Sequence, residues 1–250
     1  MTGGFFVALG DGRFRATEHT AGPWDPRHQH AGPAAALLAG ALDSRADMVL
    51  ARVTLEILGP IPIAEVEVVV DVERPGRSVE LLSGELRVDG RTVVRARAWR
   101  MLRSPARVAP AHLPPPLPDA ADPVPAGFSE FGYSRAVELR WAEGGWLDPG
   151  PAKVWTRLLV PVVEGEQPTP LQRVMVVADS GNGISAALDW SKYVFINTEL
   201  SVHVLRPPEG EWVCLEARTE VEEAGLASSV LSDRSGPVAR GAQSLLVAPR

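Results

Sequence analysis

Residues 32–42 read GPAAALLAGAL, and residues 169–179 read TPLQRVMVVAD. In both stretches a proline stands at an early helical position, where its missing N–H has no partner to lose. The first stretch is apolar on every side, which predicts a helix buried all round rather than one with a solvent face. The second begins in the same way and continues with valines and a methionine. The sequence therefore predicts one mostly buried helix in each half of the chain.

Strand-like segments surround the first of these helices. Two short segments flank a Gly-Asp-Gly turn before it, and longer segments after it alternate apolar and polar residues, as in EVEVVVDVE. Alternation with period two is typical of a strand with one buried and one solvated face. We predict strands at 5–9, 13–17, 48–58 and 64–73, and a hairpin over 78–102 that turns at Asp89-Gly90.

The second half repeats this order of elements. Strand-like segments precede its helix at 135–141 and 153–163. Others follow it at 198–205, 211–222, 226–232 and 237–247, with a turn at Ser235-Gly236 between the last two. Each half is therefore predicted to be a mostly buried helix wrapped by an antiparallel sheet, which places the protein in the α+β class.

The two halves also align with each other. Residues 32–42 lie over 169–179, and residues 51–60 lie over 198–207, in both cases without a gap and with a proline as anchor. Between the halves, residues 104–125 hold eight prolines in 22 residues, so this segment forms neither a helix interior nor a central strand. We predict two tandem domains, 1–103 and 127–250, joined by an extended linker at 104–126.

The composition excludes several classes of protein. The 250 residues include 25 Lys and Arg, 31 Asp and Glu, 45% apolar residues and one cysteine, for a net charge of −6. That apolar content excludes disorder, and the negative charge argues against a nucleic-acid partner. No apolar run is long enough to cross a membrane, residues 1–10 lack the basic flank of a signal peptide, and one cysteine excludes a disulfide framework. We expect a soluble, cytoplasmic protein.

The repeat exposes three polar residues where apolar ones are expected. Buried positions should stay apolar in both copies, but three change: Asp179 falls on Leu42, Asn197 on Leu50, and Gln243 on or next to Ala98. A carboxylate at a core-facing helix position is strongly destabilising unless it is paired or hydrogen-bonded. Each residue alone also fits a structural role in a turn or on a strand. Together they predict a polar pocket that contains water.

Four segments resemble the acyl-CoA thioesterases with a double hotdog fold, the medium-chain type II group. They are QHAGPAAALLAGAL at 29–42, VADSGNG at 177–183, INTELSVHVLRPPEGEW at 196–212 and PVARGAQSLLV at 237–247. The resemblance covers nearly the whole chain. It implies that each half is a hotdog, a long helix wrapped by an antiparallel sheet, and that the two copies pair their sheets. It also implies hydrolysis of acyl-CoA thioesters to free acid and CoA.

The resemblance also assigns roles to the three polar residues. In that family an Asp, a Thr and a Gln position the attacking water, and these residues fall on Asp179, Asn197 and Gln243. Asp179 is then the base or water-orienting carboxylate. Asn197 departs from the family Thr, although an amide also hydrogen-bonds water as donor and acceptor. Thr198 replaces it only if the register slips by one residue, which sends a strand side chain to the opposite face.

Other residues are candidates for binding the substrate. The oxyanion donor is expected to be a backbone N–H at a helix N-terminus or turn, with Gly32 and Gly181 as candidates. His30 is a candidate lining residue, and a capping role is equally open. Arg206 and Arg240 are candidates for contacts with CoA phosphates, although arginines paired with surface carboxylates would look the same.

Trp24 and Trp190 either floor an acyl pocket or pack in the core. His28 and His30 lack a third metal ligand, so the sequence predicts neither a metal nor a cofactor.

Direct attack of water on an acyl-CoA is the leading hypothesis, and no G-x-S-x-G nucleophile motif is present. Two alternatives stay open. A non-catalytic acyl-thioester binder is favoured by the Thr-to-Asn departure. An enoyl-CoA hydratase is less favoured, because no His is in register with Asp179. Acyl chain length and the choice between CoA and a carrier protein also stay open. We expect a homo-oligomer, with a dimer as the simplest form.

Overall fold

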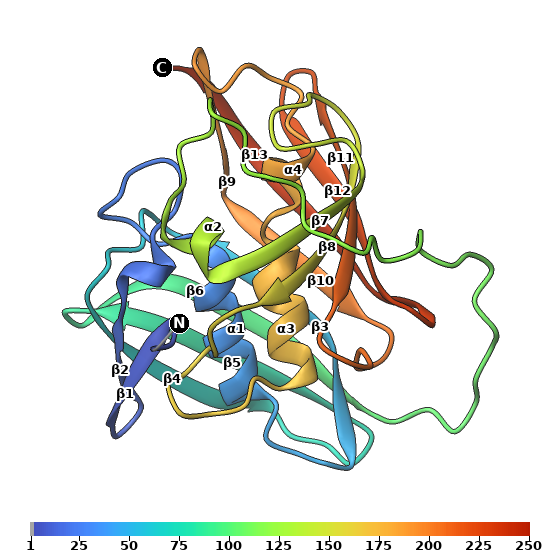
Figure 1. Cartoon of the computed structure of the whole chain (residues 1–250). Coiled ribbons are helices and arrows are strands. Elements are labelled where there is room, and N and C mark those ends of the chain that lie inside the picture. The colour runs from blue at the N-terminus through green and yellow to red at the C-terminus, as the bar shows by residue number, and fades with distance from the viewer. Residues whose placement is uncertain (1–2) are drawn as a thin grey trace.

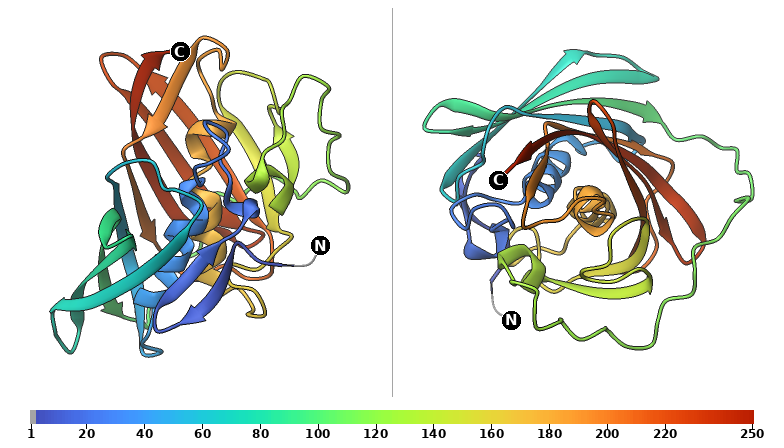
Figure 2. Two further views of the ribbon diagram at one scale, coloured as in Figure 1. Left: turned by 90° about the vertical axis from the view of Figure 1, so that its left-hand side faces the viewer. Right: turned by 90° about the horizontal axis from the view of Figure 1, so that it is seen from above.

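The computed structural model describes residues 3–250, so residues 1 and 2 of the predicted N-terminal domain lie outside the described residues. Two helices lie side by side inside a curved antiparallel sheet (Figure 1). Seen from above in Figure 2, the sheet wraps around both helices. The hydrophobic core therefore lies between the helices and the inner face of the sheet.

The described part of the first half, from residue 3 onward, contains helix α1 (Ala31–Leu42), a short 3-10 helix (Glu18–Thr20) and six strands. The strands are β1 (Phe6–Gly10), β2 (Arg13–Ala16), β3 (Met48–Ile57), β4 (Glu65–Arg74), β5 (Val79–Val88) and β6 (Arg91–Leu102). The predicted ends of α1 and of these strands differ from the observed ends by no more than one residue. Asp89 and Gly90 both have positive φ, as the predicted tight hairpin turn requires.

The second half contains three helices and seven strands. The helices are α2 (Gly132–Ala136), α3 (Pro170–Ala178) and α4 (Gly181–Ile184). The strands are β7 (Val137–Glu143), β8 (Ala152–Leu158), β9 (Tyr193–Asn197), β10 (Glu199–Val204), β11 (Val213–Val221), β12 (Gly225–Asp233) and β13 (Gly236–Pro249). The order predicted from the repeat is therefore present, with local differences.

Two strand predictions for the second half were wrong at one end. The predicted strand at 135–141 begins inside α2, and residues 181–184, for which no helix was predicted, form α4. The predicted strand at 153–163 ends at Leu158, since Pro161 has no N–H to donate to a ladder. Residues 161–163 lie along β1 instead, where the Pro161 carbonyl accepts from the Phe5 N–H at 2.9 Å. Strand β9 was not predicted.

One sheet of thirteen strands joins the two halves. Its order is β1-β2-β4-β5-β6-β3-β10-β13-β12-β11-β8-β7, and β9 pairs with β13 beyond the end of β10. The junction between the halves is the antiparallel pair of β3 and β10, in which Thr54 faces Ser201. The strands of both halves therefore form one curved surface around α1 and α3 (Figure 2).

Helices α1 and α3 pack against each other in opposite directions. Nine of the twelve residues of α1 are buried, as its all-round apolar sequence predicts. Gly32, in its first turn, faces the Val176 carbonyl near the end of α3, and Gly40 faces Gln172 near the start of α3. A Cβ on Gly32 would lie 2.4 Å from the Val176 oxygen, so only glycine allows this approach. The start of α1 consequently meets the end of α3.

The proline-rich segment contains no helix or strand between residues 103 and 131 and is largely exposed. It passes around the outside of the second half of the sheet (Figure 2). There the Trp155 indole N–H donates to the Pro115 carbonyl at 3.1 Å, and Arg140 donates to the Pro118 carbonyl at 2.8 Å. Within residues 3–250, no helix has the length and apolarity that crossing a membrane requires.

Candidate active site

The candidate site lies where the two central helices meet. His30 is the N-cap of α1, and Asp179 is the residue at which α3 ends. Antiparallel packing brings these two helix ends together, so the Asp179 carboxylate lies at the N-terminus of α1. A helix N-terminus carries partial positive charge and favours a carboxylate beside it.

Asp179, Asn197 and Gln243 lie together, as the repeat comparison predicts. The Asn197 Nδ2 donates to Asp179 Oδ1 at 2.8 Å, and the Gln243 Nε2 lies 3.3 Å from the same oxygen and 3.1 Å from the Asp179 carbonyl. Asp179 is 4% exposed and Gln243 is 2% exposed. The buried carboxylate is thus held by two amide donors, from strands β9 and β13.

His30 occupies the other side of the carboxylate. Its Nδ1 lies 3.0 Å from Asp179 Oδ2, and the Gly32 N–H approaches the same nitrogen at 3.1 Å. Two lone pairs cannot face each other at 3.0 Å, so a proton lies between Nδ1 and Oδ2. This contact corrects the expectation that no His is in register with Asp179.

The surroundings of Asp179 favour its charged form. Burial alone raises the pKa of this carboxyl, but the charge and hydrogen bond of His30, the Asn197 amide and the Gly32 N–H outweigh burial. Its pKa therefore lies below the usual value, and the shared proton belongs on His30 Nδ1. The site thus holds a carboxylate that accepts a hydrogen bond from the Nδ1–H of His30.

Tyr133 fixes the orientation of the His30 ring, and the sequence did not point to it. The two rings stack with centroids 3.9 Å apart and planes 4° from parallel. The Tyr133 hydroxyl donates to the Val176 carbonyl at 3.1 Å and lies 2.8 Å from the Ser180 Oγ. Burial raises the pKa of this phenol, so it stays protonated. Tyr133 comes from α2, which has no counterpart in the first half that could have drawn attention to it.

Asn182 holds the Gln243 side chain on the side away from Asp179, and the sequence did not point to this residue either. Its backbone N–H donates to Gln243 Oε1 at 3.1 Å, and its side-chain amide donates to the Phe195 carbonyl at 3.0 Å. Gly181 permits this approach, because a Cβ there would lie 2.8 Å from Gln243 Oε1. The Gln243 amide is thereby fixed with its NH₂ directed at Asp179.

Three other candidate residues lie away from this cluster. Thr198 is exposed and hydrogen-bonds the Ser244 carbonyl at 3.3 Å, so it does not replace Asn197. Arg240 is exposed between two buried neighbours on β13, and by strand alternation it lies on the opposite face from Gln243. Arg206 follows the far end of β10 and forms a bidentate ion pair with the buried Asp233. The side chains of these three residues make no hydrogen bond or ion pair with Asp179, Asn197 or Gln243.

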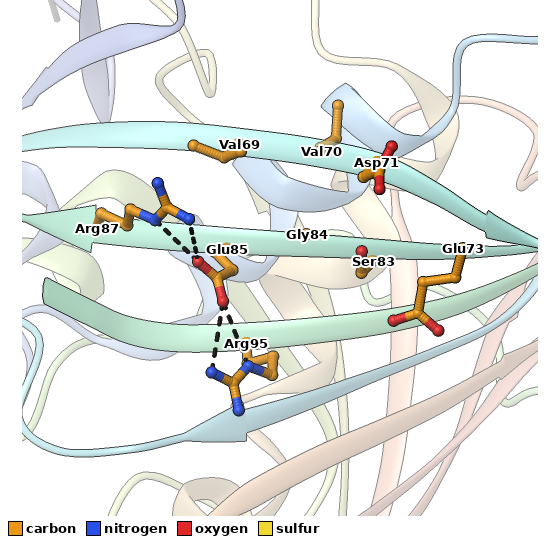
Figure 3. Close-up of a pocket in the computed structure, with 9 residues that line it drawn as sticks. All are labelled: Val69, Val70, Asp71, Glu73, Ser83, Gly84, Glu85, Arg87 and Arg95. Carbon is orange, nitrogen blue, oxygen red and sulfur yellow. Dashed lines mark hydrogen bonds and ion pairs between the residues drawn. The ribbon is translucent and has the colours of Figure 1, made fainter. Parts of the chain in front are cut away.

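The described residues 3–250 contain no group of three His, Cys, Asp or Glu side chains arranged to hold a metal ion. A hollow of about 540 Å³ lies far from Asp179, on the outer face of β4, β5 and β6 (Figure 3). Glu85 lies within it, paired with Arg87 and Arg95. This hollow is an open, charged sheet face and contributes nothing to the carboxylate site.

The class of protein follows from the fold. A hotdog-fold protein of Alicyclobacillus acidocaldarius is similar at 16% identity, covering 98% of this chain and 95% of that chain, with a TM-score of 0.70. A protein of Novosphingobium aromaticivorans described as a thioesterase gives 22% identity, coverage of 97% and 98%, and a TM-score of 0.75. The acyl-CoA thioesterase II TesB2 of Mycobacterium marinum gives 11% identity, coverage of 98% and 95%, and a TM-score of 0.71. The chain has a hotdog fold.

The family follows from the sequence. The model of the acyl-CoA thioesterase N-terminal domain matches residues 20–101, and that of the acyl-CoA thioesterase C-terminal domain matches residues 105–247. The chain therefore belongs to the acyl-CoA thioesterase family and is a thioester hydrolase. No curated protein sequence matches it.

Proposed function

We propose that the protein hydrolyses acyl-CoA thioesters to free acid and CoA by direct attack of a water molecule that Asp179, Asn197 and Gln243 orient. One observation carries this proposal. The Asp179 carboxylate is buried, and it accepts hydrogen bonds from Asn197, His30 and Gln243. A carboxylate held in this way serves as a base or as an orienting acceptor for water.

The reaction needs no covalent enzyme intermediate. The Asp179 carboxylate takes a proton from water while the water oxygen bonds to the thioester carbonyl carbon. The tetrahedral intermediate then expels the CoA thiolate as the C–S bond breaks, and the thiolate takes the proton from Asp179. The carboxylic acid product ionises to solvent. His30 and Asn197 hold the carboxylate in the geometry for the first step.

The two glycine candidates for the oxyanion donor differ in their surroundings. The Gly32 N–H is directed at the His30–Asp179 pair, which assigns it to holding the carboxylate. Gly181 opens α4, where the first N–H groups have no partner inside the helix. We therefore favour Gly181 as the donor to the developing oxyanion.

Hydrolysis of a panel of acyl-CoAs, from acetyl to palmitoyl, tests this function, with the free thiol detected by a chromogenic disulfide reagent. Wild-type protein should release thiol, with one preferred chain length, and Asp179→Asn should lower kcat by about 100-fold or more. Asp71→Asn removes an exposed carboxylate on β4 and serves as the matched control. Unchanged turnover by folded Asp179→Asn would remove Asp179 from the mechanism.

The same panel separates the alternatives. Wild-type protein that binds acyl-CoA without releasing thiol would be a non-catalytic binder. The 3.0 Å contact between His30 and Asp179 favours a second candidate, an enoyl-CoA hydratase, because that chemistry uses an Asp/His pair. Loss of the enoyl absorbance of an unsaturated CoA ester without thiol release would identify that activity.

We also propose that the chain is a double hotdog, with copies at 1–103 and 127–250 and the linker at 104–126. The sheet register supports this proposal. Thr54 and Ser201 are counterparts in the sequence alignment, and they face each other with their hydroxyl oxygens 3.2 Å apart. In an antiparallel pair related by a local two-fold axis, only the residue at the axis faces its own counterpart. The axis then lies between β3 and β10.

A further inference from the structure

Two tryptophans from opposite halves of the chain stack beside the candidate site. The rings of Trp24, from the loop before α1, and Trp190, from the loop before β9, lie 4.8 Å apart at 26°. Both side chains are half-buried. Phe195 lies beneath them, 1% exposed, with its ring 5.1 Å from Trp24 and 4.5 Å from Trp190. The pair therefore forms an aromatic platform that is partly exposed to solvent.

This platform adjoins the residues that hold the attacking water. Phe195 and Asn197 are two residues apart on β9, so their side chains lie on the same face, separated by about 7 Å. The Phe195 carbonyl also accepts from Asn182, which supports Gln243. A thioester bound at Asp179 can thus extend its thiol portion toward Trp24 and Trp190.

Two cations border the platform. The Arg250 guanidinium lies over the Trp24 ring, 5.6 Å from its centroid, at the outer limit of a cation–π contact. The Arg250 N–H donates to the Lys192 carbonyl at 2.9 Å, which holds both residues beside Trp190. Lys192 pairs with Asp189 at 3.0 Å, but both side chains are exposed, so this ion pair is weak and a phosphate can replace it.

We propose that Trp24, Trp190, Lys192 and Arg250 form a subsite for the nucleotide portion of CoA, an inference that rests on the proposed acyl-CoA hydrolysis. Purine bases stack on aromatic side chains, and phosphates bind Arg and Lys. An acyl chain needs a dry, apolar pocket, whereas this platform is half-exposed and bordered by cations. A carrier protein presents the same pantetheine arm but no adenine, so the subsite makes CoA the preferred thiol carrier.

The ratio of kcat/KM for an acyl-CoA to kcat/KM for the same acyl group on N-acetylcysteamine tests this subsite. The second ester carries the thioester without the nucleotide. Trp24→Leu and Arg250→Gln should each lower the ratio, Trp24→Leu by about tenfold, since stacking on an aromatic ring contributes on that order. Arg91→Gln, which changes an exposed arginine at the start of β6, should keep the wild-type ratio. If the ratio in both platform variants equals that of wild type, the subsite inference is wrong, but the proposed hydrolysis of acyl-CoA is unaffected.

Calorimetric binding of adenosine 3′,5′-bisphosphate gives a readout that needs no turnover. Wild-type protein should bind it, and Trp24→Leu should weaken binding by about tenfold. This binding measurement still tests the subsite if the protein hydrolyses no ester. Failure of the subsite inference can therefore be distinguished from failure of the proposed function. Absence of binding to wild-type protein would overturn the inference. Binding without any change in the substrate ratio would also contradict it, because the nucleotide would then be a free ligand rather than part of the substrate. Arg250 is exposed, so Arg250→Gln tests the proposal even if Trp24→Leu fails to fold.

Discussion

His30 Nδ1 lies 3.0 Å from Asp179 Oδ2, a contact that joins the N-cap of α1 to the C-cap of α3. Neither residue has this contact without the antiparallel packing of α1 against α3. The pairing explains how a carboxylate that is only 4% exposed stays charged. It also makes the behaviour of Asp179 depend on a residue about 150 positions away in the sequence.

Removal of the His30 imidazole should shift the pH dependence of hydrolysis. In His30→Ala, burial acts on Asp179 with less opposition, so the pKa of its carboxyl rises. The carboxylate is then lost at a higher pH, and the acid limb of the kcat/KM profile should move toward neutral pH. His28→Ala, which alters a half-buried histidine 3.7 Å from Asp25, is the control. If the pH profile of His30→Ala coincides with that of wild type, His30 does not affect the ionisation of Asp179.

At position 197, activity should survive substitution by threonine, the family residue, better than substitution by leucine, the residue at the matching position of the first repeat. In Asn197→Thr, a hydroxyl can still donate to Asp179, and kcat should stay within about tenfold of wild type. In Asn197→Leu, Asp179 Oδ1 loses its 2.8 Å donor, and kcat should fall by about tenfold or more. Steady-state kinetics on the preferred acyl-CoA compares the two variants, and equal activity in both would show that the amide donor is dispensable.

The sequence predicts the three central polar residues because the repeat supplies an internal reference for each. Leu42 is 2% exposed and its counterpart Asp179 is 4% exposed, so the polar substitution does lie at a core position. The register of the strands also supports the match of Gln243 with Ala98. Val53 pairs with Ala98, and Ser201 pairs with Ala242, which puts Gln243 opposite Leu200, the counterpart of Val53.

Tyr133 and Asn182 could not be predicted in this way, since their roles depend on contacts with distant elements. The helix α4 contains two glycines in four residues, a composition that disfavours helix, and it forms where tertiary contacts hold the Asn182 backbone and side chain. Strand β9 has only five residues, and its partner is β13, about 50 residues away. Local pattern carries little information about either element.

Gly32→Ala should destabilise the junction of the two helices. A Cβ at this position would lie 2.4 Å from the Val176 carbonyl oxygen, which belongs to the helix backbone and cannot move aside alone. Separation of α1 from α3 should lower the free energy of unfolding by about 1–3 kcal/mol. It should also lower kcat, because His30 moves relative to Asp179. Denaturant unfolding measures the first effect.

Gly59→Ala is the matched control for this substitution, because nothing lies within 4 Å of a Cβ at Gly59. Its unfolding free energy should stay close to that of wild type. Equal stability of Gly32→Ala and Gly59→Ala would mean that the helix pair can relax around an added methyl group.

Arg206→Gln should affect acid stability rather than substrate binding. Burial raises the pKa of Asp233, but the hydrogen bonds from Arg206 and from the Glu209 and Ser235 N–H groups outweigh it, so the folded-state pKa is lowered. A lowered folded-state pKa contributes stability above the unfolded-state pKa, and this stability is lost as the pH falls through the folded-state value. Without Arg206, the pKa of Asp233 rises. The variant should lose about 2 kcal/mol of unfolding free energy at neutral pH and unfold at a higher pH on acidification.

The KM of Arg206→Gln for acyl-CoA should match that of wild type, because the guanidinium is bound to Asp233 at 2.5 Å and 2.6 Å, away from Asp179. A raised KM with unchanged stability would instead indicate that Arg206 binds the phosphates of the substrate.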